Sequence, residues 1–185
     1  MMATPTVDPK DKAGMASGKK QVERRREQRS RTTSGTTTGE WIHALEIPLR
    51  GSTLLMPSAN IAEVINAGDF TPVPLAPAWL LGAFAWRTLA VPVVSFEGLM
   101  GGTVTAPTSA SKVVILYPLP GRRDWEFFAI LTHAEPRPQT IDPAHAVAAT
   151  SAELPDTPYI AAGLKLDGRL LAIPDLEALK KAFYP

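Results

Sequence analysis

Eighteen prolines are spread along this 185-residue chain, and they constrain its fold more than any other feature. Proline has no backbone N–H, so it breaks helices and is confined to the ends, edges or bulges of strands. Thirteen glycines add further turn points. Long uninterrupted helices are therefore disfavoured. The chain is expected to fold from many short elements separated by turns.

Short apolar runs after residue 40 predict about nine strands and one closing helix. The side chains of Trp41, His43, Leu45, Ile47 and Leu49 occupy alternate positions, which predicts a strand with one buried face. The other runs predicted as strands are 53–56, 61–65, 79–86, 89–94, 113–117, 125–131, 164–166 and 169–173. Because strands and helices do not alternate, the pattern favours a mainly β, barrel-type architecture.

Turn residues between these runs predict hairpins. Arg87 and Thr88 join two apolar runs, which places an arginine at a hairpin tip. Pro92 lies inside the second run and predicts an edge position or a bulge there. Asp167-Gly168 is the strongest hairpin turn in the chain. Pro174 is expected to begin a C-terminal helix, in which apolar side chains follow at helical spacing.

The first forty residues differ from the rest. They carry nine Lys and Arg against five Asp and Glu and no aromatic residue, whereas the remainder carries ten against thirteen. Such a segment cannot bury enough apolar surface to offset its ordering entropy. We therefore expect a disordered basic tail over residues 1–40 and one folded domain over residues 41–185. The basic cluster at 19–29 lacks interleaved aromatic side chains for base stacking, so nucleic-acid binding is not favoured.

Several function classes are excluded or disfavoured by composition. The chain has no cysteine, which excludes disulfides, thiol nucleophiles and cysteine metal sites. Its longest apolar stretch, residues 75–86, is too short for a bilayer span of roughly 20 residues. The first residues lack the apolar core of a signal peptide. We expect a cytoplasmic protein without membrane insertion.

The sequence contains little that indicates catalysis. Neither a nucleophile elbow nor a phosphate-binding loop is present. His43 alternates with apolar residues and is expected at an interior or rim position. His133 precedes Glu135 by two residues. These two side chains could form at most an acid–base pair or half of a metal site. We therefore predict no enzyme activity, no cofactor and no metal.

One predicted hairpin is rich in the residues that dominate protein interfaces. Trp79, Phe84, Trp86 and Arg87 lie close together in it, and Trp and Arg are frequent hot-spot residues. Alternatively these aromatic side chains belong to the core, because positions 79 and 86 have opposite strand parity. For Arg87, a partner-facing role and a merely solvated one both remain open.

Four segments together resemble a known family. Residues 78–96 resemble the signature of CheW-type chemotaxis coupling domains. Residues 61–64 are similar to that family's Val-x-Glu-Ile strand, and residues 72–77 to its proline-containing bridge. Residues 164–176 resemble its closing hairpin and C-terminal helix. The ordered set covers the chain from about residue 41 to the end.

The resemblance implies a mainly β fold of two intertwined, five-stranded, SH3-like β-barrels with a short C-terminal helix. It also implies a non-catalytic adaptor. Members of the family couple the cytoplasmic tip of a methyl-accepting chemoreceptor to the regulatory domain of a CheA-type histidine kinase. The sequences of residues 79–87 and 94–97 most resemble those of the divergent coupling proteins of the ChpC and PilI kind. Those proteins act in pilus-associated chemosensory systems, which serve twitching motility.

The resemblance also suggests individual site residues. Ile61 and Glu63 fall on a strand that faces receptor and kinase in the family, and Gly82 falls on a closely packed interface glycine. Arg87 falls on the signature arginine, expected to order the hairpin or to contact the partner. The candidate partner-binding residues are Ile61, Glu63, Gly82, Phe84, Trp86 and Arg87. A small β-barrel module that binds nucleic acid or a ligand, aided by the basic tail, is the alternative.

Overall fold

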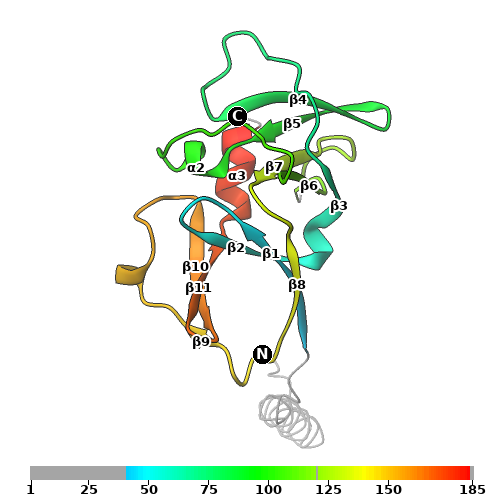
Figure 1. Ribbon diagram of the computed structural model, residues 1–185. Coiled ribbons are helices and arrows are strands. Elements are labelled where there is room, and N and C mark those ends of the chain that lie inside the picture. The colour runs from blue at the N-terminus through cyan, green and yellow to red at the C-terminus, as the bar shows by residue number, and fades with distance from the viewer. Residues whose placement is uncertain (1–40, 120, 184–185) are drawn as a thin grey trace, which may run out of the picture. The chain divides into compact units, whose positions relative to one another are not determined.

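The structure is a computed structural model that describes residues 41–119 and 121–183 (Figure 1). These residues lie within the compact unit formed by residues 39–185. The prediction of a disordered basic tail over residues 1–40 falls outside the described residues.

Eleven short strands make up most of the described part of the chain, together with two α-helices and two 3-10 helices. The strands are β1 (Ile42–Pro48), β2 (Thr53–Pro57), β3 (Ile61–Asn66), β4 (Leu80–Trp86), β5 (Leu89–Val94), β6 (Lys112–Leu116), β7 (Phe128–Thr132), β8 (Arg137–Ile141), β9 (Val147–Ala148), β10 (Ile160–Leu166) and β11 (Arg169–Pro174). The helices are α2 (Phe96–Leu99), α3 (Leu176–Phe183) and the 3-10 turns η1 (Ser58–Asn60) and η2 (Ser151–Glu153).

The strands form two sheets between which the chain passes twice. Sheet A has the order β8-β1-β2-β11-β10-β9, and sheet B has the order β3-β6-β7-β5-β4. The chain begins in sheet A, completes sheet B with β3 to β7, and then returns to sheet A. The predicted mainly β, CheW-type fold is confirmed. Sheet A has six strands rather than the expected five, because the two-residue β9 adds to β10.

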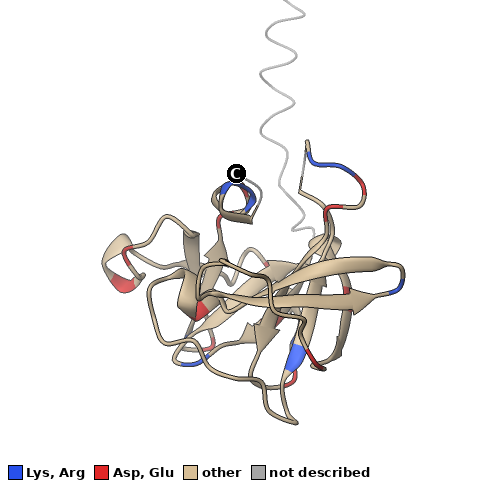
Figure 2. Cartoon of the chain, turned by 90° about the horizontal axis from the view of Figure 1, so that it is seen from above, with Lys and Arg blue, Asp and Glu red and all other residues tan. Residues whose placement is uncertain are grey.

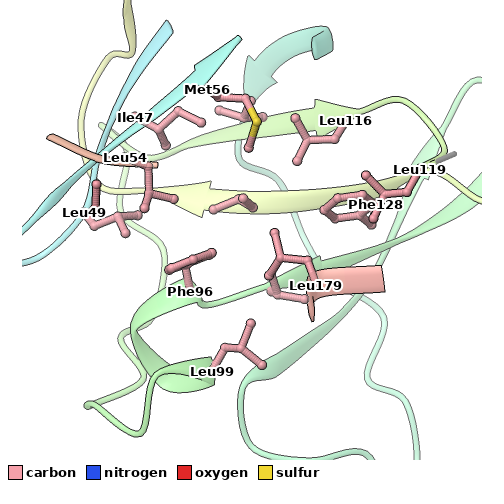
Figure 3. Close-up of a cluster of buried hydrophobic side chains, with 14 residues drawn as sticks. Ile47, Leu49, Leu54, Met56, Phe96, Leu99, Leu116, Leu119, Phe128 and Leu179 are labelled. Carbon is pink, nitrogen blue, oxygen red and sulfur yellow. The ribbon is translucent and has the colours of Figure 1, made fainter. Parts of the chain in front are cut away.

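A core shared by both sheets holds the fold together (Figure 3). Sheet A contributes Ile47, Leu54 and Met56, whereas Leu116 and Phe128 come from sheet B. The helices α2 and α3 cover this cluster with their own buried side chains. Burial of large apolar side chains is the main stabilising contribution of such a cluster. The two sheets are therefore parts of one packed unit.

The C-terminal helix α3 is confirmed, but it begins at Leu176, two residues later than its proline suggested. Pro174 is the last residue of β11. Asp175 caps the helix instead, because its Oδ1 accepts the backbone N–H of Ala178 at 2.8 Å. Leu179 is buried, and Phe183 lies 5.8 Å from Trp79, measured between ring centroids. Trp79 thus packs against the core, in agreement with the interior alternative.

The strand β1 departs from the predicted one-sided burial. Ile47 and Leu49 are buried as expected, but Trp41 is 57% exposed. Ala44 and Glu46, on the opposite parity, are buried. The reason is that β1 lies between β8 and β2, and a second apolar cluster around Ala44 covers its other face. Simple alternation assumes a single buried face.

Two further predictions, about His43 in β1 and Pro92 in β5, hold only in part. His43 is exposed, which excludes the interior alternative but not the rim position, and its Nδ1 lies 3.3 Å from the hydroxyl of Thr140. Pro92 lies in β5, which is an inner strand of sheet B, and a bulge interrupts the pairing of the neighbouring β4 at Leu81. Proline is tolerated because β7 pairs only with the two residues that follow it, Val93 and Val94.

Candidate protein-interaction site

The hairpin of β4 and β5 carries most of the candidate residues. Its strands pair from Leu80–Val94 to Trp86–Leu89, which leaves Arg87 and Thr88 as a two-residue turn. Neither strand contains a charged residue. Figure 2 accordingly shows two uncharged ribbons that end in a basic tip. The predicted hairpin with an arginine at its tip is confirmed.

Arg87 is held in a conformation that arginine seldom adopts. Its φ is +52°, in the left-handed region that favours Gly, Asn and Asp. Its side chain is 69% exposed, so burial of the side chain does not compensate for this backbone. Contacts to neighbouring side chains must therefore stabilise the tip.

Glu63 on β3 supplies those contacts. Its Oε2 accepts a hydrogen bond from Trp86 Nε1 at 2.8 Å and one from Arg87 Nη2 at 3.2 Å. The guanidinium carbon of Arg87 lies 4.4 Å from the centroid of the Trp86 ring, within the range of a cation–π contact. Three of the six candidates thus meet at one carboxylate, and we call Glu63, Trp86 and Arg87 the carboxylate cluster.

The carboxylate cluster joins the two outer strands of sheet B, because β3 and β4 lie at opposite ends of its strand order. A backbone bridge also joins the loop after β3 to β4. Thr71 and Ala83 exchange two N–H to O hydrogen bonds of 2.8 Å. The sheet therefore curls until its edges meet, as a small barrel does.

Gly82 makes this backbone bridge possible. Its φ is +144°, and a Cβ atom at this position would lie 2.6 Å from the carbonyl oxygen of Thr71. Only glycine allows such a close backbone approach. Gly82 is buried by contacts within the chain, and its assignment as a partner-binding residue stays a prediction.

The remaining candidates differ in how far they reach the surface. Trp86 is buried in the apolar cluster of sheet B. Phe84 is half-buried and makes an edge-to-face contact with Phe70, with ring centroids 6.2 Å apart. Ile61 is half-buried and packs against the shared core. Arg87 is thus the most accessible member of the set, and the partner-binding roles of the others also stay predictions.

Further aromatic residues, which the sequence analysis did not single out, extend the carboxylate cluster across the surface. Phe127 lies 5.0 Å from Trp86 and 6.0 Å from Tyr117, measured between ring centroids. Tyr117 and Trp125 are about half exposed, and Arg123 lies 5.4 Å from the Trp125 ring. Residues 125–127 were expected in a strand, but β7 begins at Phe128. An Arg and a Trp close together in a loop were the sequence signal that could have indicated this exposed aromatic surface.

A second Glu–Arg pair, also not singled out from the sequence, stabilises sheet A. Glu46 on β1 is 2% exposed and accepts hydrogen bonds from both terminal nitrogens of Arg169 on β11, at 2.7 and 2.8 Å. These bonds raise the pKa of the Arg169 guanidinium. The bidentate geometry satisfies a carboxylate that would otherwise be buried without a partner.

His133 and Glu135 do not form the pair that their spacing allowed. Glu135 lies 2.9 Å from Lys112 Nζ, whereas His133 Nε2 lies 3.2 Å from Glu97 Oε1. Glu97 also accepts the backbone N–H of Arg50 at 2.9 Å. In the part of the chain that the structure describes, no group of three or more His, Cys, Asp or Glu side chains could hold a metal ion. None of the described helices is long and apolar enough to cross a membrane.

Comparisons with known proteins agree with this architecture. Residues 43–182 match the family model of the CheW-like domain. The crystal structure of the scaffolding protein TtCheW from Thermoanaerobacter tengcongensis is similar with a TM-score of 0.63 and 17% identity, covering 74% of this chain and 90% of that one. No curated protein sequence matches the chain. The structural likeness shows the shared fold, and the family match spans well over half of the sequence, so this chain belongs to the CheW-like domain family.

Proposed function

We propose that this protein is a non-catalytic adaptor that couples a chemoreceptor to a CheA-type histidine kinase. Membership of the CheW-like family supports a role in chemosensory signal transduction as a scaffold. The observation that carries the proposal at the level of residues is the carboxylate cluster. It presents an ordered, accessible arginine on an otherwise uncharged hairpin.

The geometry of Arg87 suits recognition of an acidic or carbonyl-rich protein surface. One contact to Glu63 uses a single one of the five N–H donors of the guanidinium. The other donors are available for charge-assisted hydrogen bonds, which are stronger than neutral ones. Because Glu63 and the Trp86 ring already restrict the side chain, a partner would immobilise little additional freedom.

Apolar contact area lies close to this arginine. Tyr117 and Trp125 are exposed on the loop between β6 and β7, and Phe127 links Tyr117 to the carboxylate cluster. Aromatic residues and arginine are the usual anchors of interface hot spots. Transient signalling contacts need only a modest area, so a large apolar patch is not required.

We further propose the regulatory domain of the kinase and the cytoplasmic tip of a methyl-accepting chemoreceptor as the two partners, and the cytoplasm as the compartment. The sequence of residues 79–87 supports membership of the divergent ChpC and PilI-type coupling proteins of pilus-associated systems, with twitching motility as the output.

A titration of the full chain against the kinase regulatory domain of the same organism tests the proposal. We expect micromolar binding in calorimetry that weakens at least about tenfold in the Arg87→Asp variant. The matched control is Arg137→Asp, which reverses an exposed charge on β8. Equal losses in both variants would indicate a general charge effect instead of a site at the hairpin.

The same preparation separates the adaptor from a nucleic-acid binder. Affinity for nucleic acid falls steeply with salt concentration and should fall again when residues 1–40 are removed. An adaptor should bind the regulatory domain of the kinase equally well when residues 1–40 are removed. Absence of kinase and receptor binding by the folded chain would contradict the proposed function.

A further inference from the structure

The outer edge of β4 has no strand partner near the hairpin turn. Strand β4 is the last strand of sheet B, so one of its sides faces no further strand of that sheet. Thr71 covers this side at Ala83, where the two residues exchange both of their backbone hydrogen bonds. Between Ala83 and the turn, no described residue outside β5 forms a backbone hydrogen bond with β4.

The backbone of Ala85 points toward this open side. Along an antiparallel strand, successive residues direct their N–H and C=O groups to alternate sides. Ala83 directs both groups to Thr71, so Ala85, two positions further on, directs its own groups the same way. Ala85 is also exposed. Its donor and its acceptor can therefore pair with a further strand.

The other edge strands of the described chain are protected against such pairing. Charged residues, prolines, bulges and short length all protect an edge. Strand β8 carries Arg137 and Pro138, β9 has only two residues, and β3 carries Glu63. In β4, a bulge at Leu81 and the backbone bridge protect the half that lies away from the turn. The half next to the turn, residues 84–86, has none of these features.

A groove beside this half of β4 leaves room for a chain segment. It measures about 410 Å³, and its lining includes Thr71, Ala83, Ala85, Arg87 and Thr88. The small alanine side chains leave the backbone accessible. Figure 2 shows that the turn end of the hairpin projects from the rest of the sheet, so a partner can approach it.

The charge on the hairpin indicates the chemistry of such a segment. Arg87 is the one charged residue between positions 80 and 94. It lies two residues beyond Ala85, which is about 7 Å along a strand. Its contact with Glu63 uses a single N–H donor of the guanidinium. A carboxylate on a segment paired with Ala85 would therefore meet a charged donor that is already held in place.

We propose that an extended, acidic segment of a protein partner adds to β4 as a further strand at Ala85 and places a carboxylate on Arg87. In this mode of recognition, backbone hydrogen bonds supply affinity and side-chain contacts supply specificity. Because the open edge is short, the segment is short and the contact is weak and reversible. The proposal rests on the proposed function, since it names the form of the partner segment that the adaptor binds.

Two synthetic heptapeptides with capped ends test strand addition on the full chain. One is Ser-Thr-Val-Glu-Val-Thr-Ser, and the other has glutamine in place of glutamate. We expect an NMR titration with the glutamate peptide to shift the Ala85 amide signal in a saturable way. The glutamine peptide should bind at least about fivefold more weakly, because it lacks the charge that pairs with Arg87. Ala85→Pro should weaken binding at least about tenfold, since proline has no N–H to donate.

Ala90→Pro is the matched control. Ala90 lies opposite Ala85 in the β4–β5 ladder and is also exposed. Its N–H therefore points to the other side of the hairpin, where β7 pairs only with Val93 and Val94. Ala90→Pro should bind the glutamate peptide as the unmodified chain does. If Ala85→Pro does not fold, a glutamate peptide with N-methylated valines replaces it, and this peptide should not bind.

Strand addition and the adaptor function fail in different ways. Absence of a saturable shift at Ala85, or equal losses in Ala85→Pro and Ala90→Pro, overturns strand addition even if the kinase regulatory domain binds. Peptide binding at Ala85 without any binding of kinase or receptor contradicts the adaptor function and leaves strand addition in place. Binding of the N-methylated peptide as tightly as the unmethylated one also overturns strand addition.

Discussion

The hairpins β4–β5 and β10–β11 have turns of the same length. The turn residues suit the backbone in β10–β11, whereas in β4–β5 they do not. Each turn has two residues, and the first has a positive φ, +52° at Arg87 and +50° at Asp167. Each hairpin also carries an arginine that pairs with a glutamate on another strand. Asp-Gly suits such a turn by itself, whereas Arg-Thr does not.

The two Glu–Arg ion pairs also differ, in the number of their hydrogen bonds and in the burial of their carboxylates. Glu46 and Arg169 form a bidentate pair around a buried carboxylate, but Glu63 and Arg87 share one exposed contact. This pair supports the fold, because removal of Arg169 would leave the buried Glu46 carboxylate without its partner. A strained, exposed arginine adds little stability and is available to a partner. The comparison separates a structural hairpin from one that we propose is functional.

The largest expected effect is on stability in sheet A. Arg169→Ala should cause the larger loss in the free energy of unfolding, because the buried Glu46 carboxylate would lose both of its hydrogen bonds. Arg87→Ala should lower it by less than about 1 kcal/mol, since its ion pair is exposed. Urea unfolding of both variants measures the difference. Equal costs would abolish the distinction between the hairpins.

A smaller effect is expected from glycine substitutions in the two hairpins. Gly82→Ala should cost about 2 kcal/mol, because the added Cβ would meet the Thr71 backbone at 2.6 Å on a residue of positive φ. Gly163 on β10 is the matched control. Its Cβ would lie 2.5 Å from the flexible end of the Leu154 side chain and 3.0 Å from Ala149 Cβ, but it would meet no backbone atom and Gly163 has no positive φ, so Gly163→Ala should cost less. Thermal unfolding decides, and a larger loss for Gly163→Ala would contradict the role assigned to the Thr71–Ala83 bridge.

The smallest effect concerns an exposed pair on β10. Hydrogen bonds from Lys165, and then from Thr150, lower the pKa of Glu153 from 4.5 to about 2. A lowered pKa contributes stability above the ordinary pKa of 4.5, and this contribution is lost as the pH falls from about 4.5 through about 2. The melting temperature of the unmodified chain should therefore exceed that of Glu153→Gln slightly at pH 6. The difference should vanish near pH 2, whereas a difference independent of pH would exclude this cause.

Local features of the fold were predictable from the sequence with good accuracy. Both hairpin turns, the pairing of β6 with β7 and the amphipathic α3 are where the residue patterns predict them. Turn chemistry and periodicity act over a few residues, so they can be recognised without the rest of the chain. The burial of β1 was not predictable in this way, because its second face is covered by strands from the C-terminal part of the chain.

The candidate site also has local features that the sequence predicts and long-range contacts that it does not. The sequence by itself determined the arginine at a hairpin tip and the order of motifs that places the chain in the CheW-like family. Only the tertiary structure decided that Glu63 meets Trp86, 23 positions away, and that Glu46 meets Arg169, 123 positions away. Such contacts depend on strand order, register and sheet curvature. Those properties arise from the packing of the whole core and not from any one segment.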